Sequence, residues 1–235
     1  MKKIFAISFS LITILLVENN FSTQSGITGA WTSKQGNTTF TLVFQDGYFS
    51  YVSFDIPGKK FNHTYGGTYS ESGGQLHANI EFDNIVKDAV GSHKHFPFSI
   101  SGNTLKLTIE NVNEWTRVDE GKDALSGNWR ITGRMNNGQI QEIPLRARKT
   151  LKLMSGIRFQ WMAINTETKE FSGTGGGTYS FNDGKYIENI EFFSRDSSRV
   201  GASLSFEGSV KDNVWTHKGL SSRGEPIHEE WTREK

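Results

Sequence analysis

The chain has 235 residues, a net charge of +1, 35% hydrophobic and 12% aromatic residues, 25 glycines and no cysteine. This aromatic content excludes a disordered chain, and the near-zero charge gives no electrostatic basis for binding nucleic acid. The missing cysteine excludes disulfides, thiolate metal sites and cysteine nucleophiles. The length fits one large domain or two small ones.

The N-terminus has the pattern of a secretory signal peptide. Lys2 and Lys3 precede an apolar run over residues 4–17, and polar residues follow. The run is shorter than the about 20 residues that a membrane span needs. We therefore expect residues 1–23 to be a signal peptide and the mature protein to be secreted or periplasmic, without a membrane span and without a cysteine for lipid attachment. An uncleaved N-terminal anchor is the alternative.

An internal repeat organises the rest of the chain. Residues 66–70 (GGTYS) recur at 176–180, and residues 79–82 (NIEF) recur at 189–192, both at an offset of 110. Each copy opens with a Gly-x-Trp motif and closes with Glu-Trp-Thr-Arg. The repeat predicts two copies of one domain, at 26–121 and 124–235.

Both copies have the pattern of antiparallel strands. Apolar and polar residues alternate over residues 76–83 and again over 105–110, as they do in strands with one face on a core. Turn sequences such as Asp46-Gly47 separate these runs. We count about eight strands in each copy and no helix, which predicts an all-β protein of two tandem antiparallel up-and-down barrels. A pair of β-sandwiches fits the alternation as well.

The closing residues carry a resemblance to a known family. A Gly-x-Trp on the first strand with an arginine on the last resembles the lipocalin (calycin) signature, here Trp31 with Arg117 and Trp129 with Arg233. The resemblance implies eight-stranded barrels in which the arginine lies across the indole, a cation–π contact. The second copy is also similar to uncharacterised secreted lipocalin-like proteins of bacterial type. Each copy is shorter than a full lipocalin and lacks its C-terminal helix.

The two copies differ where the alternation predicts inward-facing residues. Ala78 of the first copy aligns with Glu188 of the second, and Leu107 aligns with His217. Val112 aligns with His228 when the closing motifs are matched. An inward carboxylate needs a partner or a ligand, so Glu188 and His217 are interpreted either as a ligand anchor or acid–base pair, or as an internal polar network.

Arginine and chain length also differ between the copies. The first copy contains Arg117 alone, whereas the second contains nine arginines. Arg195, Arg199 and Arg223 fall in loops at the predicted open mouth, where they suit an anionic group or form a basic surface that docks on the acidic first copy. About 12 extra residues within 131–150 of the second copy form either a lid over the mouth or an additional hairpin.

These patterns predict a binding protein that holds a small, largely apolar ligand with a polar or anionic group in the second barrel. The predicted ligand-binding residues are Trp161, Tyr186, Glu188, Arg195, Arg199, Trp215, His217 and His228. The alternatives are an isomerase, cyclase or hydratase that uses Glu188 and His217, and an interaction module without a ligand. We expect no cofactor, no nucleic-acid partner and no metal, because His93 and His95 lack a third ligand. The pattern does not predict an oligomeric state.

Overall fold

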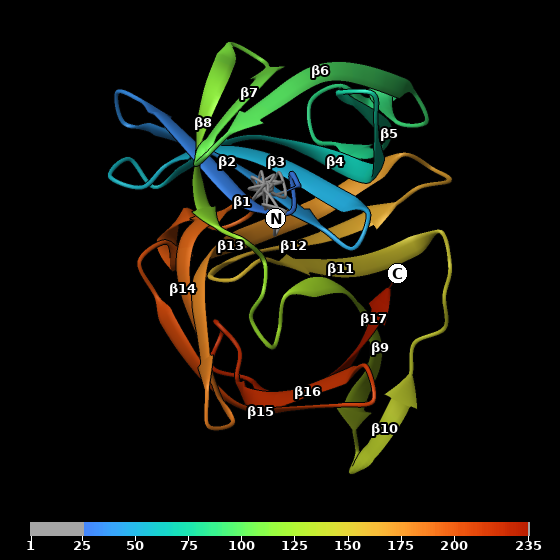
Figure 1. Cartoon of the computed structure of the whole chain (residues 1–235). Helices are drawn as coiled ribbons and strands as arrows, with labels where there is room; N and C mark the ends of the chain where they lie inside the picture. Colours follow the sequence, from blue (N-terminus) through green and yellow to red (C-terminus); the bar gives the residue numbers. More distant parts are fainter. Residues whose placement is uncertain (1–25, 235) are drawn as a thin grey trace, which may run out of the picture.

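The computed structural model describes residues 26–234, which form two closed antiparallel β-barrels in tandem (Figure 1). The all-β prediction is confirmed, and closure of both sheets excludes the β-sandwich alternative. The predicted signal peptide lies outside the described residues. Within them, no helix is long and apolar enough to cross a membrane.

Barrel 1 consists of eight strands in sequential order, closed by pairing between the first and the last. Its strands are β1 (Gly29–Gln35), β2 (Thr38–Gln45), β3 (Tyr48–Asp55), β4 (Lys60–Ser72), β5 (Gln75–Asp83), β6 (His93–Ser101), β7 (Thr104–Ile109) and β8 (Val112–Asp119). A single 3-10 turn, η1 (Lys87–Ala89), connects β5 to β6.

Barrel 2 repeats this order and adds one strand. Its strands are β9 (Gly127–Asn136), β10 (Gln139–Glu142), β11 (Arg148–Met154), β12 (Arg158–Asn165), β13 (Glu170–Asn182), β14 (Lys185–Phe193), β15 (Ser203–Lys211), β16 (Val214–Leu220) and β17 (Pro226–Glu234), with the 3-10 turn η2 (Ser197–Arg199). Pairing of β9 with β17 closes the barrel. The extra residues form β10, which pairs only with the end of β9 as an additional hairpin.

Alternation of side chains gives the strands their inner and outer faces. In β5, Leu76, Ala78 and Ile80 are buried in the barrel core while the residues between them are partly exposed. Hairpins join these strands through residues with positive φ, such as Asp46 and Gly47, which the favoured two-residue turns require.

Glycine at one repeated position lets adjacent strands approach closely. At Gly67 and Gly177 the pairing shifts register, and a Cβ atom would lie 2.0 Å from the carbonyl oxygen of Asn79 or Asn189. Only glycine tolerates such an approach. The repeated Gly-Gly therefore marks a bulge that bends β4 and β13 around their barrels.

The closing tryptophans are alike in the two barrels, and the closing arginines are not. Trp31 and Trp129 are fully buried, and each indole donates to a carbonyl four residues earlier, at 2.7 and 2.8 Å. The Arg117 guanidinium lies 3.9 Å from the Trp31 ring centroid, as the cation–π prediction requires. Arg233 instead donates to Asp46 of barrel 1, at 2.7 and 2.9 Å.

The barrels pack against each other through their outer faces. Val43 and Tyr48 of barrel 1 share one buried cluster with Leu151 and Leu153 of barrel 2. This explains why β2 and β3 are buried on both faces. Two ion pairs cross the contact, Arg233 with Asp46 and Lys149 with Glu81 at 2.8 Å, and in both the cation belongs to barrel 2.

Candidate functional site

Barrel 2 contains a cavity of about 550 Å³ that opens where β16 turns into β17. Buried charged side chains form its base, and apolar side chains and a polar loop at the mouth line the rest. The lining includes Ile131, Arg134, Thr150, Lys152, Trp161, Ala163, Glu188, Ile190, Phe193, Leu204, Phe206, His217, Arg223, Glu225, Ile227, Glu229 and Trp231. This volume lies within the range of small-molecule sites.

A buried ion pair forms part of the base. Lys152 on β11 points inward beside the closing Trp129, and its Nζ lies 2.7 Å from Glu188 Oε1 on β14. Both side chains are less than 10% exposed. Nζ is also 5.1 Å from the ring centroids of Trp215 and Trp231. Aromatic faces and a carboxylate therefore compensate the ammonium, which would otherwise be costly to bury.

Glu188 has a second donor next to it in the chain. The Tyr186 hydroxyl donates to the same Oε1 atom at 2.7 Å. Burial and the negative charge of Glu188 raise the pKa of Tyr186 well above 10.0. Tyr186 is therefore a neutral hydrogen-bond donor that holds the Glu188 carboxylate in place.

A histidine on β16 is bonded to a second carboxylate, on β17. His217 Nε2 lies 3.2 Å from Glu229 Oε2 and 3.2 Å from Trp231 Nε1. One ring nitrogen either donates to the carboxylate or accepts from the indole, so the tautomer decides which bond is made. His217 Nδ1 has no hydrogen-bond partner among the described residues. Arg134 donates to the other Glu229 oxygen, at 2.7 Å.

The surroundings lower the pKa values of both His217 and Glu229. Burial and the nearby Lys152 lower the pKa of His217 below 6.5, against the opposing effect of Glu229. Burial alone would raise the pKa of Glu229, but the hydrogen bond from His217 and the charges of Lys152 and Arg134 lower it to about 2. The expected state near neutral pH is an ionised Glu229 beside an uncharged imidazole.

The predicted aromatic residues lie at two depths. Trp161 lines the cavity, and its ring packs edge-on against Phe193 at a centroid distance of 5.4 Å. Tyr186 and Trp215 are fully buried in the core cluster of barrel 2. They lie behind the lining residues. Tyr186 contacts Glu188 and Trp215 contacts His217, and these two neighbours face the cavity in their place.

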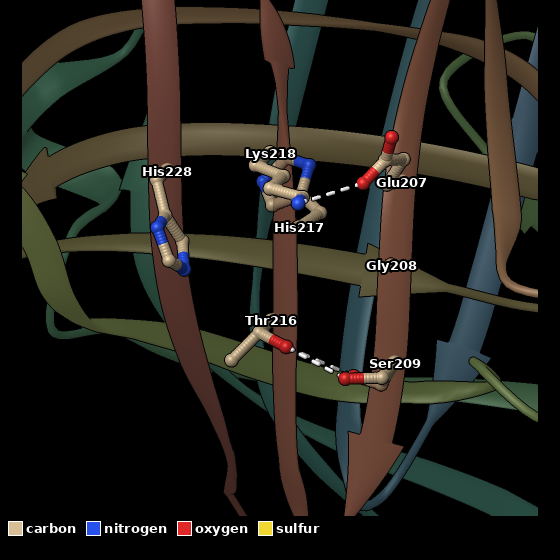
Figure 2. Close-up of a pocket in the computed structure, with 7 residues that line it drawn as sticks. All are labelled: Glu207, Gly208, Ser209, Thr216, His217, Lys218 and His228. Atoms are coloured by element: carbon tan, nitrogen blue, oxygen red, sulfur yellow. Dashed lines mark hydrogen bonds and ion pairs between the residues drawn. The ribbon is translucent and has the colours of Figure 1, made fainter.

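Glu188 and His217 both face the cavity but do not bond to each other. The direct pair that we considered is replaced by two pairs, Lys152 with Glu188 and Glu229 with His217. His228 has the opposite orientation. It lies opposite Lys218 in the pairing of β16 with β17, on the outer face of the barrel. Its side chain lines a separate external pocket of about 310 Å³ (Figure 2).

Figure 2 shows that this external pocket is an ordinary polar strand surface. Lys218 pairs with Glu207 at 2.8 Å and Ser209 with Thr216 at 2.8 Å, each across neighbouring strands. The inward prediction for His228 is wrong, because β17 alternates regularly with Ile227, Glu229 and Trp231 inward. In β8, by contrast, Val112 and Trp115 are both buried, so matching the closing motifs does not transfer the inward face.

Two of the three predicted mouth arginines, Arg195 and Arg199, do not line the cavity, whereas Arg223 does. Arg195 is exposed, and Arg199 pairs with Asp196 at 2.9 Å. The arginines that do line it are Arg134 and Arg223.

Among the lining residues missed from the sequence, four belong to the hydrogen-bonded pairs around Glu188 and His217: Arg134, Lys152, Glu229 and Trp231. Lys152 could have been found, because it aligns with Leu42 at the same offset of 110 that aligns Glu188 with Ala78. Glu229 could not, because its counterpart Asn113 is exposed in β8, where the alternation is broken between Val112 and Trp115.

Chemically, the site combines apolar lining residues with a buried base that holds fixed hydrogen-bonding groups. Within residues 26–234, no three side chains of histidine, cysteine, aspartate or glutamate are arranged to hold a metal ion. On barrel 1, His95 contacts His77 with 2.8 Å between the Nδ1 atoms, so these two imidazoles pair with each other.

No protein-family model matches the chain, and a search of characterised proteins finds no match.

Proposed function

We propose that this protein is a lipocalin-like binding protein whose second barrel holds a small, largely apolar ligand with a polar group. The observation that carries the proposal is the contrast in the barrel interiors. Leu42, Ala78 and Leu107 belong to one packed apolar cluster in barrel 1, whereas their counterparts Lys152, Glu188 and His217 line a cavity in barrel 2.

The arrangement of the cavity supports a binding role. Apolar side chains form much of its lining, as in most small-molecule sites, and the buried polar groups converge at its inner end. Rigid β-strands hold these polar groups, which is a favourable basis for a preorganised site. Barrel 1 packs against the wall formed by β11 and β12 through the shared buried cluster and so supports it.

A binding experiment with the neutral dye Nile red tests the proposal. We expect the wild-type protein to bind one dye molecule with a rise in fluorescence. Leu204→Trp, which fills the cavity, should weaken binding at least tenfold. The matched control Leu145→Trp changes a leucine that is 65% exposed and should not alter binding. Absence of wild-type binding, or equal binding by Leu204→Trp, contradicts the proposal.

Native mass spectrometry of the exported protein provides a second test. A small molecule that co-purifies with wild type and is lost from Leu204→Trp would support the same site. Thermal unfolding of both tryptophan variants checks that any loss of binding does not reflect a loss of folding.

An enzymatic function is the second candidate, and the His217–Glu229 contact favours it. A neutral imidazole held by a carboxylate is a common arrangement for a general base. Once a bound molecule is identified, the variant Glu188→Gln distinguishes a catalytic role from a binding role. Lost turnover with retained binding favours catalysis, and weakened binding without any turnover favours the binding protein.

A further inference from the structure

The charged groups that line the cavity cancel one another. Lys152 pairs with Glu188 and Arg134 pairs with Glu229, each at 2.7 Å. The remaining two, Arg223 and Glu225, have opposite charges and are exposed in the loop at the mouth. The lining therefore offers no net charge to a ligand.

An ionic ligand would have to disrupt one of these pairs. A carboxylate at the base would compete with Glu188 for Lys152, and an ammonium would compete with Lys152 for Glu188. Either would leave one buried charge without its partner, in a region where both side chains are less than 10% exposed. Such an uncompensated buried charge is strongly unfavourable.

The base nevertheless has open hydrogen-bonding capacity. Glu188 Oε1 receives both Lys152 and Tyr186, while Oε2 has no hydrogen-bond partner among the described residues. The Lys152 ammonium has three N–H donors, and its one hydrogen bond to a described residue is the bond to Glu188. An acceptor and donors thus lie next to each other at the polar end of the cavity.

We propose that the cavity selects a neutral apolar molecule that carries a hydroxyl and binds with the hydroxyl at the base. The hydroxyl donates its proton to Glu188 Oε2 and accepts a hydrogen bond from Lys152. A hydroxyl uses both groups and leaves the ion pair intact, which neither a carboxylate nor an ammonium can do. This inference rests on the proposed function and replaces the anionic group expected from the arginine distribution.

A series of ligands with the same chain tests the inference. Decanol, decanoate and decylammonium are titrated into the full mature protein at neutral pH by competition with Nile red. We expect decanol to bind at least tenfold more tightly than either ion. Tighter or equal binding of decanoate or decylammonium would overturn the inference and leave the proposed function intact.

The variant Glu188→Gln tests which group sets the selectivity. It removes the negative charge beside Lys152, so the ratio of decanoate to decanol affinity should rise at least tenfold. Glu207→Gln is the matched control, because Glu207 pairs with Lys218 on the outer face of the barrel. An unchanged ratio in folded Glu188→Gln, or an equal change in Glu207→Gln, would overturn the inference.

The double variant Lys152→Leu/Glu188→Ala tests whether the polar pair itself, and not a change in the shape of the cavity, causes the preference for a hydroxyl. It places the barrel 1 residues Leu42 and Ala78 at their positions in barrel 2. We expect it to bind Nile red while losing the preference for decanol over decane. Retained preference would overturn the hydroxyl assignment. Binding of Nile red without binding of any decyl compound to wild type would also overturn it, whereas failure of Nile red itself contradicts the proposed function.

Discussion

Barrels 1 and 2 share a scaffold and differ in their interiors. Both close through a buried tryptophan on the first strand, and both bend at a glycine pair in the same register. The inner face of barrel 1 is aliphatic and aromatic. Barrel 2 replaces three of its aliphatic side chains with Lys152, Glu188 and His217.

The difference shows how a core becomes a site without loss of the fold. The new charges are compensated in pairs, because Glu188 faces Lys152 and Glu229 faces both His217 and Arg134. A single unpaired charge would destabilise the barrel, whereas a pair with good geometry is close to neutral in stability. The comparison between the barrels thus becomes a set of substitutions that exchange their residues.

The largest effect is expected from breaking the buried pair. Glu188→Ala alone leaves the Lys152 ammonium without its carboxylate and should lower the free energy of unfolding by about 3–5 kcal/mol. The double variant Lys152→Leu/Glu188→Ala should lose clearly less stability than Glu188→Ala, because it leaves no unpaired charge, and its main cost is the Tyr186 hydroxyl left without an acceptor. Urea unfolding at neutral pH measures both. Additive losses in the double variant would show that the pair is not coupled.

A matched pair of isoleucines tests whether barrel 2 is hollow where barrel 1 is filled. Ile80 and Ile190 occupy the same repeat position, and only Ile190 lines the cavity. Ile80→Ala should cost about 2–5 kcal/mol, since it creates a new void. Ile190→Ala should cost less, because the removed volume joins a space that already exists. Equal losses of stability in urea would contradict this difference.

Much of the fold could be predicted because it depends on local patterns that occur twice. Alternation indicates strands, Gly-Gly marks the bulge, and the offset of 110 superimposes one copy on the other. Closure could not be derived from alternation, because a sandwich and a barrel share it. The pairings that close each barrel join residues nearly a whole copy apart, such as Trp31 with Arg117.

Glu188 and His217 were predicted because they lie where the repeat is in register, although Lys152, which is also in register, was missed. Glu188 and His217 follow the constant offset, and both face the cavity. Regular alternation in β17 places Glu229 inside and His228 outside, whereas the alternation of β8 is broken between Val112 and Trp115. Because side chains alternate with a period of two, one additional residue exchanges the faces of a strand. The side-chain pairing itself depends on distances across the barrel that no local pattern contains.

The closing arginines provide the third test. Arg117 stacks on Trp31 within its own barrel, whereas Arg233 joins the two barrels through Asp46. Asp46→Asn should lower the free energy of unfolding by about 1–3 kcal/mol, the usual contribution of a hydrogen bond between charged groups. Glu207→Gln disrupts an ion pair whose side chains are largely exposed and should cost less than about 1 kcal/mol. Equal losses in the free energy of unfolding in urea would show that the Arg233–Asp46 pair does not stabilise the contact between the barrels.

The smallest expected effect is a pH dependence that barrel 2 has and the equivalent position of barrel 1 lacks. Because the pKa of His217 is lowered in the folded state, the folded protein binds fewer protons below pH 6.5 than the unfolded chain. Stability should therefore fall as the pH decreases from 6.5 toward the folded value, with a slope below about 1.4 kcal/mol per pH unit. Glu229 contributes in a separate window, where stability falls as the pH drops from 4.5 toward about 2.

Replacing the histidine by the barrel 1 residue isolates its contribution. His217→Leu should remove the slope just below pH 6.5, since leucine has no proton to bind, while Glu229 retains Arg134 as a partner. His228→Leu changes a histidine on the outer face and should leave that slope in place. Urea unfolding of the three proteins across this pH range makes the comparison. If His217→Leu keeps the wild-type slope, the acid sensitivity arises elsewhere, and the cavity histidine does not distinguish the two barrels in their response to pH.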